Sequence, residues 1–201
     1  MTRFRAMLAR YFTPDQLSRI QRTRLTIIGC GGLGSNAAQA LVRCGFEKIV
    51  LIDFDLVALS NLNRQAFHPG QCGMLKCAAL RDGLSRINTA ARIVTRAIRV
   101  AEDNIREIIG EADIVLEAVD QAATKRLIFE NCLQHGRPVV CASGIAGFGD
   151  CENLHVRRGR HYAVIGDGEI SVQICKPLAP KVMAAAAMQA DEVLRMVLHD
   201  E

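Results

Sequence analysis

The chain has 201 residues, half of them apolar and 23% charged, with a formal net charge of +4. This balance is typical of a soluble globular protein with room for one domain and a substantial core. The mild charge and the scarcity of aromatic residues argue against a nucleic-acid surface built on base stacking. No apolar run approaches the roughly 20 residues that span a bilayer, and the N-terminal stretch lacks a signal-peptide pattern, so we expect a cytoplasmic protein.

Short apolar runs alternate with helical patterns along the whole chain. After an N-terminal helical segment at 1–22, we expect strands and helices in turn, the last helix spanning 178–200 and rich in alanine. The strands are predicted at 24–28, 48–52, 93–100, 113–119, 138–142, 154–158 and 161–166, and the intervening helices at 35–44, 73–87, 104–109 and 122–134. This alternation predicts a single domain over residues 1–201, a Rossmann-like three-layer α/β/α fold whose mostly parallel sheet is extended by antiparallel strands. Ligands of such sheets bind at the carboxyl ends of the strands.

The chain contains eight cysteines, an unusually large number for its composition. A disulfide scaffold is disfavoured because the chain is long and shows no secretion signal. A structural zinc site would show CxxC pairs, and no cysteine spacing here is of that kind. We therefore expect most of the cysteines to be buried thiols in the core.

A G-x-G-x-x-G motif directly follows the first predicted strand and opens a helix. Gly29 permits the tight turn, Gly31 lets a phosphate approach the backbone, and Gly34 lets the helix pack on the strand. The helix N-terminus offers free N–H groups to phosphate. Asp53 ends the next strand, 19 residues after Gly34, where its carboxylate can accept both ribose hydroxyls. These features predict a nucleotide site, with a tightly packed turn as the structural alternative.

The residues that follow favour a triphosphate over a dinucleotide. Asn61, Arg64 and Lys76 come shortly after the second strand, and Asp120 ends the strand at 113–119. A triphosphate with a metal needs cations and a carboxylate together. Arg64 can bind phosphate oxygens in bidentate fashion, whereas Lys76 would act as a point charge. NAD would in addition call for a further catalytic domain, for which little length remains.

The segments at 29–35, 53–55 and 60–65 together resemble the ubiquitin-activating-enzyme-like superfamily, whose bacterial members include ThiF, MoeB and HesA. The resemblance covers nearly the whole chain. It implies MgATP-dependent adenylation of the C-terminal Gly-Gly carboxylate of a small ubiquitin-like protein. By resemblance, Asp53 holds the ribose and Asp120 the magnesium. The nucleotide-binding set that it implies is Gly29, Gly31, Gly32, Gly34, Asp53, Asp55, Asn61, Arg64 and Lys76.

The resemblance also implies a homodimer in which an N-terminal arginine reaches the triphosphate in the partner's site. Arg3, Arg5 and Arg10 are the candidates, and spacing from the glycine motif favours Arg5. The alternative is an amphipathic surface helix whose arginines are solvated.

The segments at 166–168 and 178–182 resemble the short ThiF subfamily. Longer relatives bind zinc through two CxxC pairs, which are absent here, so we expect no structural zinc. The segment that corresponds to the crossover loop of the longer relatives is compressed to about 166–177. By resemblance, Cys175 lies roughly where those relatives have a cysteine that takes part in sulfur transfer by forming an acyl persulfide with the carrier. The alternative is that Cys175 is an incidental loop thiol, and Cys151 is a weaker candidate for the sulfur-transfer role. The glycine-rich stretch 144–149 is predicted either to line the path of the carrier's tail or to be a flexible turn.

The resulting hypothesis is an adenylyltransferase for the sulfur carrier ThiS in thiamin thiazole synthesis. Alternatives within the class are another carrier, such as the small subunit of molybdopterin synthase, or a non-protein carboxylate. Rivals outside it are an NAD-dependent oxidoreductase and a non-catalytic protein that only binds the carrier. His68 is expected to pack or cap, and His135 and His161 carry no functional signal.

Overall fold

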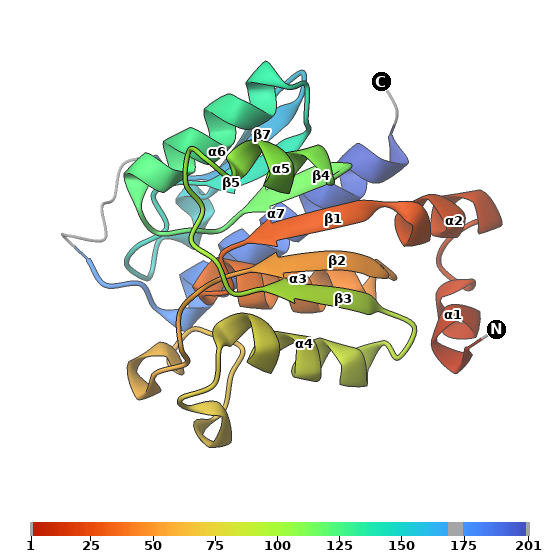
Figure 1. Cartoon of the computed structure of the whole chain (residues 1–201), viewed down its shortest axis with the longest axis horizontal. Coiled ribbons are helices and arrows are strands. Elements are labelled where there is room, and N and C mark those ends of the chain that lie inside the picture. Colours follow the sequence, from red (N-terminus) through yellow and green to blue (C-terminus); the bar gives the residue numbers. More distant parts are fainter. Residues whose placement is uncertain (1, 169–174, 200–201) are drawn as a thin grey trace.

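A computed structural model of the protein describes residues 2–168 and 175–199. Within this part of the chain, seven strands form one sheet in the order β3-β2-β1-β4-β5-β7-β6 (Figure 1). The strands are β1 (Arg24–Ile28), β2 (Lys48–Ile52), β3 (Arg92–Arg96), β4 (Ile114–Glu117), β5 (Val139–Ala142), β6 (His155–Gly159) and β7 (Tyr162–Gly166). The α-helices are α1 (Arg3–Leu8), α2 (Pro14–Arg22), α3 (Gly32–Arg43), α4 (Lys76–Ile87), α5 (Ile105–Gly110), α6 (Ala122–Gln134) and α7 (Ala179–Leu198), and short 3-10 helices span Leu59–Asn61, Pro69–Gln71 and Cys151–Asn153.

The predicted fold class is confirmed, with more parallel pairing than expected at the far end of the sheet. All neighbouring strands from β3 through β7 pair in parallel, and β6 alone of the described strands runs antiparallel, to β7. We expected both of the last strands to lie outside the parallel part. Because β7 takes the position beside β5, the tight connection from β6 to β7 leaves β6 at the edge, in the opposite direction.

Apolar residues cover both faces of the sheet, as a parallel sheet between helices requires. On one face, strand residues such as Ile27 and Leu116 pack against α3, α4 and α7, whereas Ile28 and Val115 point to the other face and pack against α5 and α6. Figure 1 shows the layers in this arrangement. Adjacent residues on a strand point to opposite faces, so each strand supplies both cores.

Small residues bring α7 against α3. Ala185, Ala186 and Ala190 on α7, and Ala37 and Ala38 on α3, are all buried in the first of these cores. The short side chains let the two helix backbones approach closely, which places the first turn of α7 next to the start of α3. The C-terminal helix spans Ala179–Leu198 and has His199 as its C-cap, whereas the predicted range was 178–200, the last residue of which lies outside the described residues.

The predicted N-terminal helical segment is divided into two helices. A capping box forms at Thr13, whose side chain accepts from Gln16 N while Gln16 Oε1 accepts from Thr13 N, and Pro14 occupies the first turn of α2. Such a signal begins a new helix and ends the preceding one. Both helices lie at the end of the molecule where β1 starts, away from the carboxyl ends of the strands (Figure 1). In the described residues, we find no helix with the length and apolar content that crossing a membrane requires.

Candidate functional site

The loop at residues 29–34, here called the phosphate loop, follows β1 and leads into α3. Gly29 has a φ of +96°, and a Cβ there would lie 2.5 Å from the carbonyl oxygen of Ala118. A Cβ at Gly34 would lie 1.8 Å from Gly29 O, so the helix packs directly on the turn. A Cβ at Gly31 would meet Gln65 Nε2 at 3.7 Å and nothing nearer. Two glycines therefore serve packing, and Gly31 leaves the room a bound group would use.

The N-terminus of α3 is open to an anion. Its N-cap is Gly31, which supplies no capping side chain. The first-turn N–H groups of a helix lack partners within the helix, and together with the helix dipole they favour phosphate. Arg64 lies beside this turn, since a Cβ at Gly32 would be 3.5 Å from Arg64 Cγ. The predicted loop and one predicted phosphate ligand thus come together.

Asp53 directly follows β2 and contacts the phosphate loop. Its Oδ2 accepts a hydrogen bond from Cys30 N at 2.7 Å, and its Oδ1 accepts one from Asp55 N at 2.8 Å. Burial raises the pKa of the Asp53 carboxyl, and these two hydrogen bonds and the charge of Lys76 oppose that rise. The carboxylate is held beside the loop in the position that the motif predicted for a ribose ligand.

Lys76 is the first residue of α4 and is brought to the same edge by a backbone link. An isolated antiparallel bridge joins Leu56 to Leu75, and Lys76 N donates to Asp55 O at 2.9 Å. The ammonium Nζ then lies 2.8 Å from Asp55 Oδ2, with 9% of the lysine side chain exposed. The loop between β2 and α4 therefore positions a nearly buried cation close to Asp53.

The other two predicted phosphate ligands are held by their neighbours. Arg64 Nη1 donates to Ser60 O at 3.2 Å and to Asn63 Oδ1 at 2.7 Å. Asn61 Oδ1 accepts from Ala58 N at 3.0 Å, which caps the 3-10 turn and leaves the amide nitrogen of Asn61 available as a donor. Both side chains keep N–H groups that can be offered to a ligand.

Asp120 lies just beyond β4 and is exposed. Val119, the residue before it, is close to the phosphate loop, because a Cβ at Gly29 would lie 3.0 Å from Val119 N. Among the described residues, no group of three His, Cys, Asp or Glu side chains could hold a metal ion. Magnesium commonly takes one or two carboxylates and completes its shell with substrate phosphates and water. A single exposed carboxylate beside a phosphate loop fits that mode.

A partly buried ion pair between Glu117 and Lys125 was not predicted. Glu117 is fully buried, and its two carboxylate oxygens lie 2.9 and 3.2 Å from Lys125 Nζ, which also donates to Ala142 O at 3.0 Å. Burial raises the pKa of the Glu117 carboxyl, and the lysine opposes it. Gln189 of α7 donates to Glu117 O at 2.9 Å. An acidic residue within an otherwise apolar strand was the sequence signal that such a partner must exist.

Arg5 is not at this site within its own chain. It forms a two-point ion pair with Glu47, with Arg5 Nε 2.8 Å from Glu47 Oε1. Glu47 precedes the first residue of β2, so the pair lies at the edge of the sheet opposite Asp53. The pKa of Arg5 is raised by its hydrogen bond to Glu47 and by the charge of that carboxylate. The predicted role of Arg5 in a partner's site therefore requires the arginine to leave Glu47.

The predicted crossover region is partly described. Cys175 is half-buried, with its Cβ 3.7 Å from the position of a Cβ on Gly147, while residues 169–174 of the predicted loop lie outside the described residues. Cys151 is exposed. All eight cysteines are unbonded thiols and four of them are buried, namely Cys30, Cys77, Cys132 and Cys141. We expected most of the cysteines to be buried in the core, and four of the eight are.

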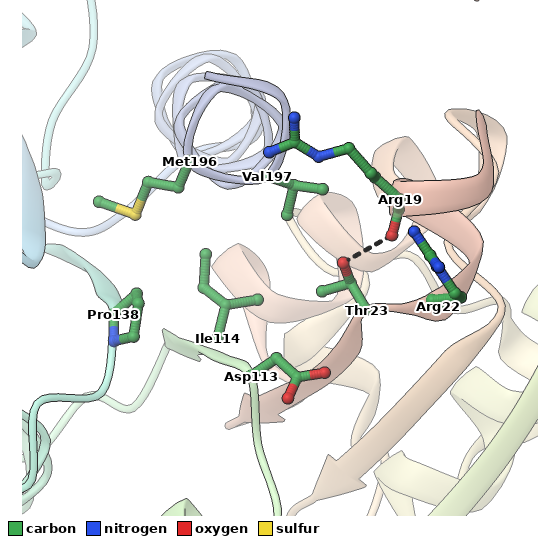
Figure 2. A pocket seen from close by; sticks show the side chains of 8 residues that line it. All are labelled: Arg19, Arg22, Thr23, Asp113, Ile114, Pro138, Met196 and Val197. Atoms are coloured by element: carbon green, nitrogen blue, oxygen red, sulfur yellow. Dashed lines mark hydrogen bonds between the residues drawn. The ribbon is translucent and has the colours of Figure 1, made fainter. Parts of the chain in front are cut away.

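A cavity of about 310 Å³ lies at the other edge of the sheet (Figure 2). Arg19 and Arg22 from the end of α2 stand on one side, and the apolar side chains of Ile114, Met196 and Val197 lie toward the other (Figure 2). These residues sit at the amino ends of β1 and β4 and at the C-terminal end of α7. Ligands of parallel sheets bind at the carboxyl ends, so the chemistry assembled around the phosphate loop identifies the site better than this hollow does.

The chain matches the model of the ThiF family over residues 4–201. It is 28% identical over 199 residues to the molybdopterin-synthase adenylyltransferase of Escherichia coli K12, covering 96% of this chain and 80% of that one. It is 29% identical over 188 residues to the adenylyltransferase and sulfurtransferase UBA4 of Candida glabrata, covering 90% of this chain but 43% of the relative. The chain thus spans less than half the length of the UBA4 relative.

Solved structures share the fold. Escherichia coli TcdA, a tRNA N6-threonylcarbamoyladenosine dehydratase, superposes with a TM-score of 0.86 at 22% identity in its complex with AMP, covering 96% of this chain and 93% of that one. The TcdA complex with ATP gives the same TM-score and identity. Escherichia coli MccB with MccA-N7isoASN gives 0.76 at 20% identity, covering 98% of this chain and 64% of MccB.

Proposed function

The chain belongs to the ThiF family, and on that premise we propose that it is an ATP-dependent adenylyltransferase that activates a carboxylate. One observation carries the proposal. The open phosphate loop, the Asp53 carboxylate and the Lys76 ammonium converge at the carboxyl ends of β1 and β2, with Asp120 just beyond the adjacent strand β4. This is a single ATP-binding domain, built on one sheet.

Each group in the site has a role that its chemistry suits. Asp53 holds the ribose, the first-turn N–H groups of α3 and the side chains of Arg64, Asn61 and Lys76 hold phosphates, and Asp120 holds magnesium. The bound metal supplies charge neutralisation on the phosphate oxygens. Asp55 is bound to Lys76 and fixes its position.

The reaction needs little covalent chemistry from the protein. The substrate carboxylate attacks the α-phosphorus of ATP, an acyl–phosphate bond forms, and the bond to pyrophosphate breaks. The protein holds the attacking and leaving oxygens in line and offsets the charge that builds up on the phosphates. A nearly buried ammonium such as that of Lys76 is effective here, because water screens it less than it would screen an exposed one.

The substrate we propose is the C-terminal Gly-Gly carboxylate of a ubiquitin-like sulfur carrier, ThiS of thiamin thiazole synthesis in particular. Two relatives carry the name adenylyltransferase, which supports the reaction class, and the similarity to the short ThiF subfamily supports the carrier. A homodimer completed by Arg5 and a cytoplasmic location belong to the same proposal.

The test is ATP–pyrophosphate exchange with the purified protein and purified ThiS. Exchange that depends on the carrier supports the proposal, and a carrier lacking its terminal glycine is the matched control. If exchange occurs with the molybdopterin synthase small subunit and not with ThiS, the reaction is adenylation as proposed, but the carrier is the molybdopterin synthase subunit. If the protein binds a carrier but no ATP, it is a binding protein, and if NAD stabilises it where ATP does not, it is an oxidoreductase.

A second substrate class has one observation in its favour. This chain covers 93% of the length of TcdA. The name of TcdA mentions a tRNA nucleoside and no protein carrier, so an enzyme of nearly this size can act on a substrate other than a carrier protein. Pyrophosphate exchange driven by a non-protein carboxylate, and not by any carrier, would favour that class.

A further inference from the structure

Lys181 is a charged residue placed entirely inside the protein. Its side chain is 0% exposed, and Nζ lies 2.7 Å from Asp150 Oδ2 and 2.8 Å from Asp167 Oδ2. Burial lowers the pKa of Lys181, but the hydrogen bonds to the two carboxylates outweigh it and raise the pKa above the ordinary value. These three residues are called the Lys181 cluster. The site described above uses none of them.

The Lys181 cluster joins three segments that are separate in the sequence. Asp150 directly follows the glycine-rich loop at residues 144–149, which is here called the second glycine loop. Asp167 follows β7, and Lys181 lies in the first turn of α7. The segments touch elsewhere too, since a Cβ at Gly144 would lie 2.2 Å from Asp167 Oδ1. The second glycine loop is therefore fastened at both of its ends.

The stretch just before α7 runs along the second glycine loop. Gly147 N donates to Lys176 O at 3.3 Å, and Gly147 forms an isolated parallel bridge with Pro177. The loop also presents an apolar side chain, because Phe148 is 75% exposed. A backbone rich in glycine beside an exposed aromatic ring suits an extended, glycine-ended peptide that must approach closely.

The other side of the same stretch contacts the nucleotide site. A Cβ at Gly32 of the phosphate loop would lie 2.9 Å from Val182 Cγ1, and Asn63 Nδ2 donates to Pro177 O at 3.5 Å. Residues 177–182 thus lie between the phosphate loop and the second glycine loop. Whatever fixes these residues also fixes the distance between the two loops.

From this placement we infer that Lys181 is a positioning residue: through Asp150 and Asp167 it holds the second glycine loop in register with the phosphate loop, so that the carrier's Gly-Gly tail meets the α-phosphate. The inference rests on the proposed function. Apolar residues of similar volume would serve stability as well as a buried ion cluster does. Charges with fixed partners instead specify one relative placement of the segments that they join.

The experiment compares Lys181→Met and Lys181→Arg with the wild-type protein and with Lys48→Met, which changes an exposed lysine at the amino edge of the sheet. For Lys181→Met, kcat/KM for the carrier should fall by about 100-fold, the loss that an ångström-scale displacement brings, while the Kd for ATP stays within about twofold of wild type. Lys181→Arg should recover much of the loss because the guanidinium can reach both carboxylates. An unchanged kcat/KM, or an equal loss in ATP affinity, overturns the inference.

Two further measurements keep the test decisive. If Lys181→Met does not fold because the carboxylates of Asp150 and Asp167 lose the ammonium between them, the variant with Lys181→Met, Asp150→Asn and Asp167→Asn together removes the charges and takes its place. Hydrogen–deuterium exchange of residues 144–150 needs no carrier: faster exchange in the variant supports the inference, and unchanged exchange overturns it. If the wild-type protein shows no ATP–pyrophosphate exchange, the proposed function is refuted. Hydrogen–deuterium exchange would still test whether Lys181 positions the second glycine loop.

Discussion

Lys76 donates a hydrogen bond from Nζ to Asp55 Oδ2 across 2.8 Å at the carboxyl end of β2. The lysine side chain is almost buried, and half of the Asp55 side chain is exposed. The ammonium of Lys76 therefore lies where the dielectric constant is lower than in water, so its charge acts more strongly. Burial raises the pKa of the Asp53 carboxyl, and the charge of Lys76 is one of the influences that oppose this rise.

Removing either cation should abolish most of the catalysis without unfolding the protein. We expect Lys76→Met and Arg64→Ala each to lower ATP–pyrophosphate exchange by about 100-fold, the usual loss for one preorganised donor to developing charge. Melting curves should stay close to wild type, with Lys48→Met as the control. Wild-type exchange in either variant would remove that residue from the site.

The two motif glycines with packing roles should respond to a single methyl group. A Cβ at Gly34 would lie 1.8 Å from Gly29 O, so Gly34→Ala should lower the free energy of unfolding by about 3 kcal/mol through overpacking. Gly83 of α4 is the matched control, because a Cβ there meets nothing within 4 Å. Gly83→Ala should stabilise by about 0.5–1 kcal/mol. Urea denaturation measures both, and equal effects would contradict the packing account.

Arg5 is tested by mixing two defective proteins. If Arg5 acts in the partner's site, Arg5→Ala and Lys76→Met are each inactive as homodimers, yet a mixed dimer contains one site with both native residues. Re-associating equal amounts should restore about a quarter of the wild-type exchange, from half of the dimers with one working site each. No recovery, or activity in Arg5→Ala alone, would mean that its pairing with Glu47 is its whole role.

Glu192 of α7 should make stability depend on pH in the acid range. Burial raises the pKa of its carboxyl, but hydrogen bonds from Arg158 and Arg195 outweigh burial and hold the pKa below the ordinary 4.5. A depressed pKa stabilises the fold above 4.5, and this contribution disappears as the pH falls through the folded-state pKa. Glu192→Gln should therefore lower the free energy of unfolding by roughly 1–3 kcal/mol at neutral pH. That deficit should shrink below pH 4.5; a deficit that does not change with pH would argue against the ion pairs as its source.

Cys175 is tested by separating adenylation from sulfur transfer. With a persulfide donor present, Cys175→Ser should stop thiocarboxylate formation on the carrier and leave pyrophosphate exchange unchanged, because the acyl persulfide forms after the adenylate. Cys72→Ser, at another accessible thiol, is the control. Thiocarboxylate produced at the wild-type rate by Cys175→Ser would show that the thiol has no catalytic role.

Much of the site was predictable because its signals are local. The phosphate loop and Asp53 each follow directly after an apolar strand, and parallel strands bring their carboxyl ends to one edge of the sheet. The order of residues along the chain was therefore enough to place Gly29, Gly34 and Asp53 together. The alternation of short apolar runs with helical patterns likewise indicated an α/β protein whose sheet is buried on both faces.

Only the tertiary structure decided the contacts between distant segments. Lys181 is 31 residues from Asp150 and Gln189 is 72 residues from the carbonyl of Glu117 that it binds, and no periodicity links such pairs. The same holds for Arg5 and Glu47, which are 42 residues apart, and for β7, whose direction depends on which strand it lies beside. A charged residue in an apolar segment of the sequence indicates that it needs a partner, because a buried charge is costly unless it is paired. Which group becomes the partner depends on the packing of the helices on the sheet, since only groups that folding brings within hydrogen-bonding distance can pair with it.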